Sequence, residues 1–87
     1  MKHAGGEALD RLEPLLERLR ACPGMKEKTR GVFYRAGRAF LHFHEDPAGL
    51  FADVRDAAGR DFDRVRVDDD AGAALVALVE KRLGEAL

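Results

Sequence analysis

The sequence predicts an α+β fold: a two-layer sandwich with an N-terminal helix, a four-stranded antiparallel meander sheet and a C-terminal helix. Three patterns predict it: leucines at helical spacing near the start, short apolar runs between turn residues in the middle, and an apolar helical stripe near the end. The 87 residues suffice for one domain and are too few for two. We expect residues 1–6 to form a flexible tail and residues 7–87 to form the domain.

The first helix is predicted to run from about Leu9 to just before Pro23-Gly24, where the backbone geometry of proline and glycine ends it. Pro14 interrupts this helix, because proline in a helix interior removes a hydrogen bond. It lies either in the first turn, with Asp10 as the cap, or at a kink. The buried stripe consists of leucines three or four residues apart, namely Leu12, Leu15, Leu16 and Leu19.

The strongest supersecondary signal is a β-hairpin, because two runs of strand-forming residues flank Ala36-Gly37. A glycine in second place favours a three-residue loop with a type I turn and a G1 bulge, and a two-residue loop is the alternative. The choice decides whether Phe33 or Tyr34 faces the core, since a slip of one residue exchanges the two faces of a strand. In the second strand we expect Leu41 and Phe43 on the core face, and on the opposite face Phe40, His42 and His44.

Two further strands and a helix complete the predicted fold. Residues 46–49 form a turn and residues 50–55 a third strand, with Leu50, Ala52 and Val54 inward and Asp53 outward. Residues 61–67 form a fourth strand, whose change of parity predicts a bulge near Asp63-Arg64 or an edge position. The acidic run 68–70 suits the start of a helix over about residues 71–85. With both helices on one face of the sheet, the other face is open to water, a ligand or a second copy.

Composition argues for a binding protein rather than an enzyme. Hydrophobic residues make up 46% of the chain, charged residues make up 36%, and the formal net charge is −1, values that suit a globular domain. The chain contains no serine, which excludes a Ser-His-Asp triad, and it contains no glycine-rich phosphate-binding motif. We therefore predict no catalytic residue and no cofactor.

The expected location is the cytoplasm. The longest apolar run, residues 73–79, is too short to span a bilayer, and the first ten residues lack the apolar segment of a signal peptide. Cys22 is the only cysteine, so no internal disulfide can form, which fits a reducing compartment. No membrane partner is expected.

The segment RAFLHFHED, residues 38–46, carries the candidate site. Two histidines two residues apart on a strand can bind one metal ion, and a nearby carboxylate can add a ligand, which gives the set His42, His44 and Asp46. A site normally takes a third ligand from elsewhere in the fold, and the only other histidine, His3, lies in the expected tail, where an incidental position is an equal alternative. Alternatively, the same face contacts a ligand, a protein partner or a second copy through Arg38, Phe40, His42 and His44.

A basic stretch supplies a further alternative. Aromatic residues interleaved with basic ones can stack bases and hold phosphates, which suggests weak DNA binding through Lys26, Lys28, Arg30, Arg35 and Arg38. The slightly negative net charge favours a protein partner over nucleic acid. The leading prediction is therefore a non-catalytic interaction module that uses the open sheet face, with a homodimer as the expected form.

Residues 22–46, CPGMKEKTRGVFYRAGRAFLHFHED, resemble the bacterial MmcQ/YjbR-like proteins. In that family a helix ends at Pro-Gly, a strand leads to a glycine and a basic residue, here Gly37-Arg38, and a second strand carries aromatic residues. The resemblance covers roughly residues 12–67 and implies a frataxin-like (CyaY-like) α-β-α sandwich in a small cytoplasmic protein. DNA binding is proposed for some members. This chain is short and has room for only one helix after the fourth strand, so that proposal transfers poorly. Gly37 and Arg38 match the family at the level of the fold, and no functional residue carries over.

Overall fold

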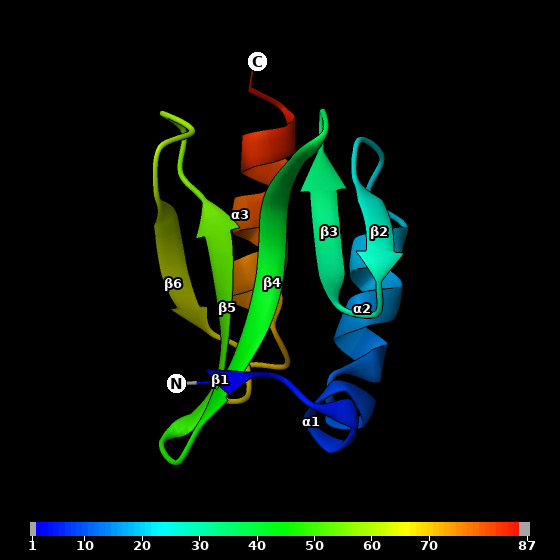
Figure 1. Ribbon diagram of the computed structural model, residues 1–87, viewed down its shortest axis with the longest axis vertical. Coiled ribbons are helices and arrows are strands. Elements are labelled where there is room, and N and C mark those ends of the chain that lie inside the picture. The colour runs from blue at the N-terminus through cyan, green and yellow to red at the C-terminus, as the bar shows by residue number, and fades with distance from the viewer. Residues whose placement is uncertain (1, 86–87) are drawn as a thin grey trace.

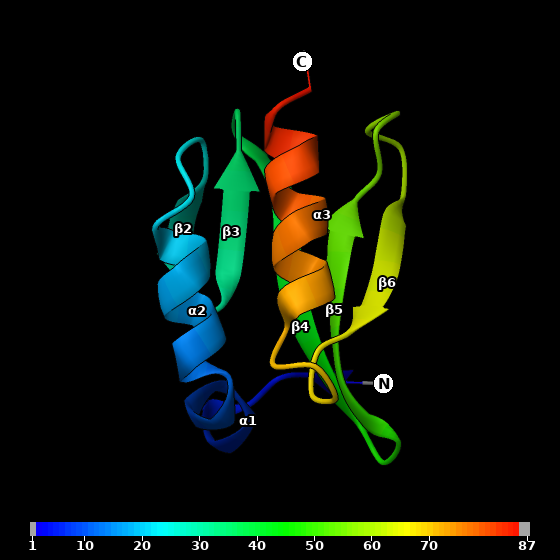
Figure 2. The ribbon, with the colours of Figure 1, turned by 180° about the vertical axis from the view of Figure 1, so that it is seen from behind.

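The computed structural model describes residues 2–85, which form a six-stranded antiparallel sheet with helices packed on one of its faces (Figures 1 and 2). The strand order is β2-β3-β4-β5-β6, and β1 pairs with β4 beyond the end of β3. The predicted α+β class, with an antiparallel sheet and helices at both ends, is confirmed, but the predicted count of four strands is wrong. The elements are β1 (Lys2–His3), α1 (Gly6–Arg11), α2 (Glu13–Arg20), β2 (Lys26–Thr29), β3 (Val32–Arg35), β4 (Arg38–Asp46), β5 (Gly49–Arg55), β6 (Phe62–Arg66) and α3 (Ala73–Leu83).

The N-terminal helix, predicted as one element, is two short helices that meet at Leu12. This residue has φ −91° and ψ 0° and caps both the end of α1 and the start of α2. Pro14 then lies in the first turn of α2, where its missing N–H has no intrahelical partner to lose. The first-turn alternative is therefore right for Pro14, and the cap is Leu12 rather than Asp10. The buried side of α2 consists of Leu15, Leu16 and Leu19.

The two strands that the sequence pattern misses are polar or very short. β2 has the sequence KEKT and lies at an edge of the sheet, where polar residues are common. β1 has two residues, and its pairing continues through Ala4, whose N–H donates to the carbonyl of Phe43 at 3.1 Å. Residues 2–4 are thus bonded to β4, so the expectation of a flexible tail is wrong for them. Residue 1, the first of that expected tail, lies outside the described residues.

The predicted hairpin is the pair β3 and β4, and its loop has two residues. Arg35 pairs with Arg38, and the residues between them, Ala36 and Gly37, have φ of 51° and 79°. Two consecutive positive φ values define the type I′ turn, whose twist matches that of the flanking strands. The favoured three-residue loop is therefore wrong and the two-residue alternative is right. Phe33 is the inward residue of β3, with 1% of its surface exposed.

A bulge early in β4 changes which of its residues reach the core. Phe33 pairs with Leu41 and Tyr34 pairs with Ala39, so Phe40 is an extra residue between two pairs. A bulge bends the strand and breaks the strict alternation of sides. Phe40 is 4% exposed and packs in the core together with Leu41, which corrects its predicted place on the open face. Alternation resumes after Leu41, with Phe43 buried and His42 and His44 on the open side.

β5 and β6 follow the prediction with two differences. The inward residues of β5 are buried as expected, but Asp53, on the other side of the strand, is buried as well. β6 pairs with β5 without a shift in register from Phe62 to Arg66, so the bulge predicted near Asp63-Arg64 is absent. The alternative of an edge strand is right, because β6 ends the strand order.

α3 lies beside α2 on the covered face of the sheet (Figure 2). Asp70 accepts hydrogen bonds from the N–H groups of Gly72 and Ala74, at 2.9 and 3.0 Å, so the acidic run does prepare the start of the helix. The buried side of α3 consists of Leu75, Val76 and Val79. Within residues 2–85 the helices are all too short or too polar to cross a membrane. Figure 1 views the opposite face, which no helix covers.

Candidate metal centre on the open sheet face

β1 brings a third histidine to the pair predicted from the sequence. His3 pairs directly with His44, and Lys2 pairs with Glu45, whose carboxylate lies 3.5 Å from the Lys2 ammonium. The same carboxylate accepts a hydrogen bond from the N–H of Gly5 at 2.7 Å. β1 is therefore fixed to β4 on both sides of His3, and the alternative of an incidental position for His3 is wrong.

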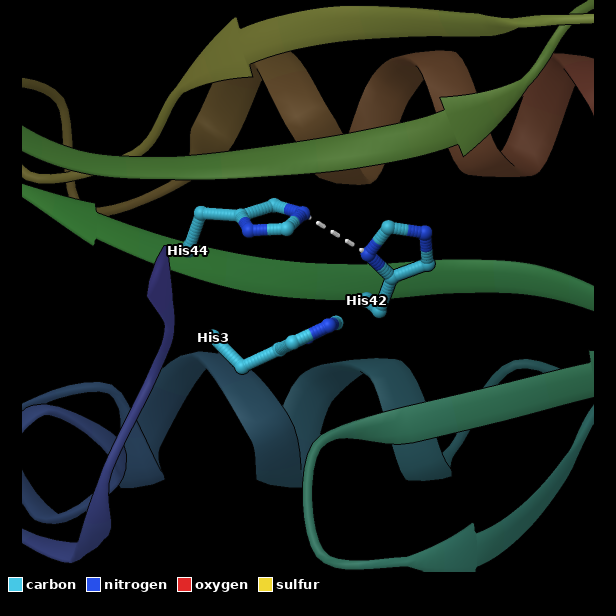
Figure 3. Close-up of side chains that lie close together, drawn as sticks. All are labelled: His3, His42 and His44. Atoms are coloured by element: carbon cyan, nitrogen blue, oxygen red, sulfur yellow. Dashed lines mark hydrogen bonds between the residues drawn. The ribbon is translucent and has the colours of Figure 1, made fainter. Parts of the chain in front are cut away.

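The three imidazoles face one another on the open side of β4 (Figure 3). One ring nitrogen of each lies within 4.8 Å of those of the other two. Nδ1 of His42 is 3.0 Å from Nε2 of His44, and the ring centroids of His3 and His44 are 4.9 Å apart. Two nitrogens bound to one tetrahedral Zn²⁺ at about 2.0–2.1 Å lie roughly 3.4 Å apart. Small rotations of the side chains would therefore bring these donors to the spacing of a metal site.

A buried carboxylate supports this cluster from β5. Asp53 is 7% exposed, and one of its oxygens lies 3.0 Å from Nε2 of His44. Arg64 on β6 donates two hydrogen bonds to Asp53, at 2.9 and 3.0 Å. These bonds hold the pKa of the Asp53 carboxyl below its usual value, so it is ionised at neutral pH. A carboxylate beside a ligating imidazole is a common outer partner in metal sites, where it orients the ring and raises its basicity.

His44 has one nitrogen in contact with two partners and one with none. The carboxylate of Asp53 repels a lone pair at Nε2, so this nitrogen carries the proton that it shares with His42. Nδ1 then has the lone pair, and it is buried without a hydrogen-bond partner among residues 2–85. Such unsatisfied buried atoms are few in native proteins, and a bound ion or an ordered water is among the groups that satisfy them. A cation at Nδ1 would give this atom the partner that it lacks and leave Nε2 donating to Asp53 as an outer partner, whereas a cation at Nε2 would have Asp53 as a direct neighbour.

His42 is prepared to act as a neutral ligand. Its ring contacts Phe62 of β6, with the centroids 5.0 Å apart. Burial, followed by the nearby His44, lowers the pKa of His42 below its usual value. A metal ion binds the unprotonated imidazole, so a lowered pKa favours coordination at neutral pH.

The carboxylate predicted from the sequence is not part of this cluster. Asp46 lies at the end of β4, and its side chain accepts a hydrogen bond from the N–H of Ala48 in the following turn, at 2.9 Å. It is absent from the group of donors within 4.8 Å, which among the described residues contains the three histidines alone. The predicted set His42, His44 and Asp46 is therefore replaced by His3, His42 and His44, with Asp53 alongside.

The predicted basic patch is divided between several environments. Arg30 forms ion pairs with Asp10 and Glu13, so its charge is neutralised on α1 and α2. Lys28 stands over the ring of Tyr34, with Nζ 4.3 Å from the centroid. Arg35 and Arg38 instead donate to backbone carbonyls at the far end of the sheet. Lys26 is exposed on β2. The five residues do not form one surface for nucleic acid.

Comparison with known proteins does not assign a function to this site. No family model, curated protein or solved structure matches the chain. The resemblance to the MmcQ/YjbR-like proteins stays a prediction.

Proposed function

We propose that the protein is a binding module that holds a divalent transition-metal ion on the open face of its sheet, with His3, His42 and His44 as ligands. The observation that carries the proposal is the meeting of all three histidines of the chain, contributed by β1 and β4, with one ring nitrogen of each within 4.8 Å of the others. Imidazole nitrogens suit Zn²⁺ and its neighbours in the first transition row rather than Mg²⁺ or Ca²⁺. Three such ligands leave a fourth tetrahedral position open to water or to the carboxylate of Asp53.

The surroundings of the cluster favour this role. Asp53 is buried beside His44, and its carboxylate can orient that ring. Arg64 donates two hydrogen bonds to Asp53, so the carboxylate compensates the positive charge of Arg64, which would otherwise repel a bound cation. The lowered pKa of His42 keeps that ring unprotonated at pH 7.

The test is a titration of the untagged chain with Zn²⁺ by calorimetry, and with Co²⁺ by visible absorption, which reports tetrahedral coordination. We expect one ion per chain. The double variant His42→Ala, His44→Ala should lose binding, and His3→Ala should weaken it about tenfold or more. Asp46→Asn is the matched control, because an amide oxygen can still accept the bond from Ala48 while the charge is removed. It should bind as the native chain does.

Two results would contradict the proposal: the absence of one-to-one binding by the native chain, or binding that survives the double replacement. An equal loss in Asp46→Asn and His3→Ala would show that general negative charge, not the histidine cluster, attracts the ion. Circular dichroism of each variant separates a lost ligand from a lost fold.

A second candidate is self-association through the same face, which we infer from its half-buried aromatic residues. Phe51 and Phe62 lie under the guanidinium groups of Arg66 and Arg55, at 6.0 and 4.7 Å from the ring centroids. Aromatic residues and arginine are enriched at protein interfaces. Light scattering with Zn²⁺ and with a chelator tests it, and a monomer mass in both conditions would exclude the homodimer.

A further inference from the structure

A second polar site lies at the other end of the sheet from β1. There the β3–β4 turn, the loop after β5 and the end of α3 come together (top of Figure 1). They enclose a cavity of about 200 Å³ whose lining includes Arg35, Arg38, Phe40, Arg55, Gly59 and Arg82. None of the residues of the histidine cluster lines it, so the two sites are separate.

Three of these arginines are held by backbone carbonyls rather than by carboxylates. Arg35 donates to the carbonyl of Arg82 at 2.7 Å, at the end of α3. Arg38 donates to the carbonyl of Gly59 at 2.8 Å, and Arg55 donates to the same carbonyl at 3.1 Å. Arg55 also donates to the carbonyl of Ala39 at 2.7 Å. A carbonyl fixes the position of a guanidinium but carries no charge to neutralise it.

Other arginines of the sheet and helices pair with carboxylates instead of backbone carbonyls. Arg20, Arg30 and Arg64 each form an ion pair with an aspartate or glutamate. Within residues 2–85, Arg35, Arg38 and Arg55 form no ion pair with a carboxylate. Three positive charges of fixed position therefore surround one small cavity.

The acidic residues of the lining are engaged elsewhere. Asp56 accepts the N–H of Arg60 at 3.1 Å inside its own loop. The Glu85 carboxylate lies 3.7 Å from Nε of Arg82, which also pairs with Asp63 at 2.8 Å. Arg82 is thus neutralised by acids, Asp56 keeps its negative charge, and Arg35, Arg38 and Arg55 leave the balance of the described lining positive.

The rigidity of this arrangement adds to its charge. The guanidinium of Arg35 lies over the ring of the buried Phe40, 5.7 Å from its centroid, and that of Arg55 lies over Phe62. Each guanidinium has five N–H donors in a planar fork. Arg38 uses one of them within the described residues and is exposed at the edge of the cavity. Donors held in advance lose less conformational entropy when a ligand binds.

We propose that this cavity binds the phosphate group of a small phosphorylated molecule. A guanidinium fork matches the oxygens of a phosphate. The double negative charge of a phosphate suits three arginines that form no ion pair within residues 2–85 better than a single carboxylate does. The volume lies below the ~300–1,000 Å³ usual for whole-ligand pockets. It therefore fits one anionic group, with the remainder of the ligand outside. This site is independent of the proposed metal centre.

The test uses the intact chain with a chelator present, so that the metal centre plays no part. Inorganic phosphate, phenyl phosphate and benzoate are titrated while the Nε–Hε signals of the arginines are followed by NMR. We expect both phosphates to shift the signals of Arg35, Arg38 and Arg55, and benzoate to do so more weakly. Tighter binding of phenyl phosphate than of inorganic phosphate would identify a phosphomonoester as the ligand class, and the reverse order would identify the free ion.

Two charge-matched variants decide the outcome. Arg38→Gln removes the arginine whose loss disturbs the fold least, and it should weaken phosphate binding about tenfold or more. Arg60→Gln removes the same charge from the neighbouring loop, outside the cavity lining, and should change the affinity for phosphate less than about twofold. Equal effects of the two variants, or no shift of the three arginine signals with either phosphate, would overturn the proposal. Arg38→Lys, which keeps the charge and loses the fork, should fall between the native chain and Arg38→Gln.

Discussion

Each face of this sheet buries side chains of β5, but by different means. On the covered face, Ala52 and Val54 of β5 are fully buried beneath the layer of α2 and α3. Between them, Asp53 points to the face without helices and is also buried. Its cover consists of side chains from the neighbouring strands, His44 on β4 and Arg64 on β6.

This difference distinguishes a core from a site. The covered face is apolar, and its burial stabilises the fold in proportion to the area removed from water. The open face buries a carboxylate and half-buries two imidazoles, an arrangement that stabilises far less per residue because polar groups must be desolvated. Under the proposed function, groups buried at such a cost serve binding rather than folding. The following predictions test that distinction from the largest expected effect to the smallest.

Replacing a covered-face residue should have the largest effect on stability. Leu41→Ala removes a fully buried side chain of β4 and should lower the free energy of unfolding by about 2–5 kcal/mol. The neighbouring open-face variant His42→Ala, without metal, should cost much less. Urea unfolding followed by circular dichroism measures both. Similar losses in the two variants would mean that the open face is part of the folding core.

Zinc should stabilise the protein through the open face alone. Ligand at about 100 times its dissociation constant adds ~2.7 kcal/mol to the free energy of unfolding. Thermal melts with Zn²⁺ and with a chelator should therefore differ for the native chain and for Leu41→Ala, and should coincide for the double histidine variant. A shift that persists in the double variant would place the ion elsewhere.

The same shift should depend on pH in a definite direction. The folded-state pKa of His42 is lowered, so protons compete with zinc for this ring only as the pH falls through that lowered value. Without metal, stability should also decrease as the pH falls below about 6.5, because the unfolded chain then binds a proton that the folded His42 resists. Melts between pH 7.5 and pH 5, with His42→Phe as the comparison, measure both effects.

The elements that the sequence predicts are those whose signal is local. The leucine stripe of α2, the hairpin at Ala36-Gly37 and the alternation of β5 all follow from residues close together in the chain. The bulge at Phe40 is not local, because it depends on how β3 and β4 twist together. For this reason the alternation of residues in the sequence assigns Phe40 to the wrong face of the sheet.

The candidate site depends on long-range pairing, and so only half of it could be predicted. The spacing of His42 and His44 within one predicted strand identifies them as candidate ligands. His3 joins them through a two-residue strand some forty residues away, and Asp53 joins them across the β4–β5 register, where it pairs with His42. The one sequence signal for β1 is the opposite charge of Lys2 and Glu45, which cannot be distinguished from chance before the pairing is known.

The buried carboxylate should contribute a smaller amount of stability, and only above its pKa. Asp53→Asn removes the charge that Arg64 and His44 face and should cost about 1 kcal/mol at pH 7, since Arg64 is half exposed and solvent screens the pair. The folded pKa of Asp53 is depressed, so its contribution is present above the unfolded value near 3.8 and is lost as the pH falls through the folded pKa. The difference in urea midpoint between native chain and variant should therefore shrink at low pH. A difference that is constant with pH would show that the charge is not responsible.

The smallest effect concerns the turn that assigns β4 residues to the two faces. An added Cβ at Gly37 or at Gly6 would meet no other atom within 4 Å, but Gly37 has φ +79° whereas Gly6 lies in α1. Gly37→Ala should therefore destabilise by about 1 kcal/mol through its left-handed backbone alone, and Gly6→Ala should be neutral or stabilising, because alanine favours a helix. Equal unfolding free energies for the two variants would contradict the type I′ turn. The register that places His42 on the open face would then need another origin.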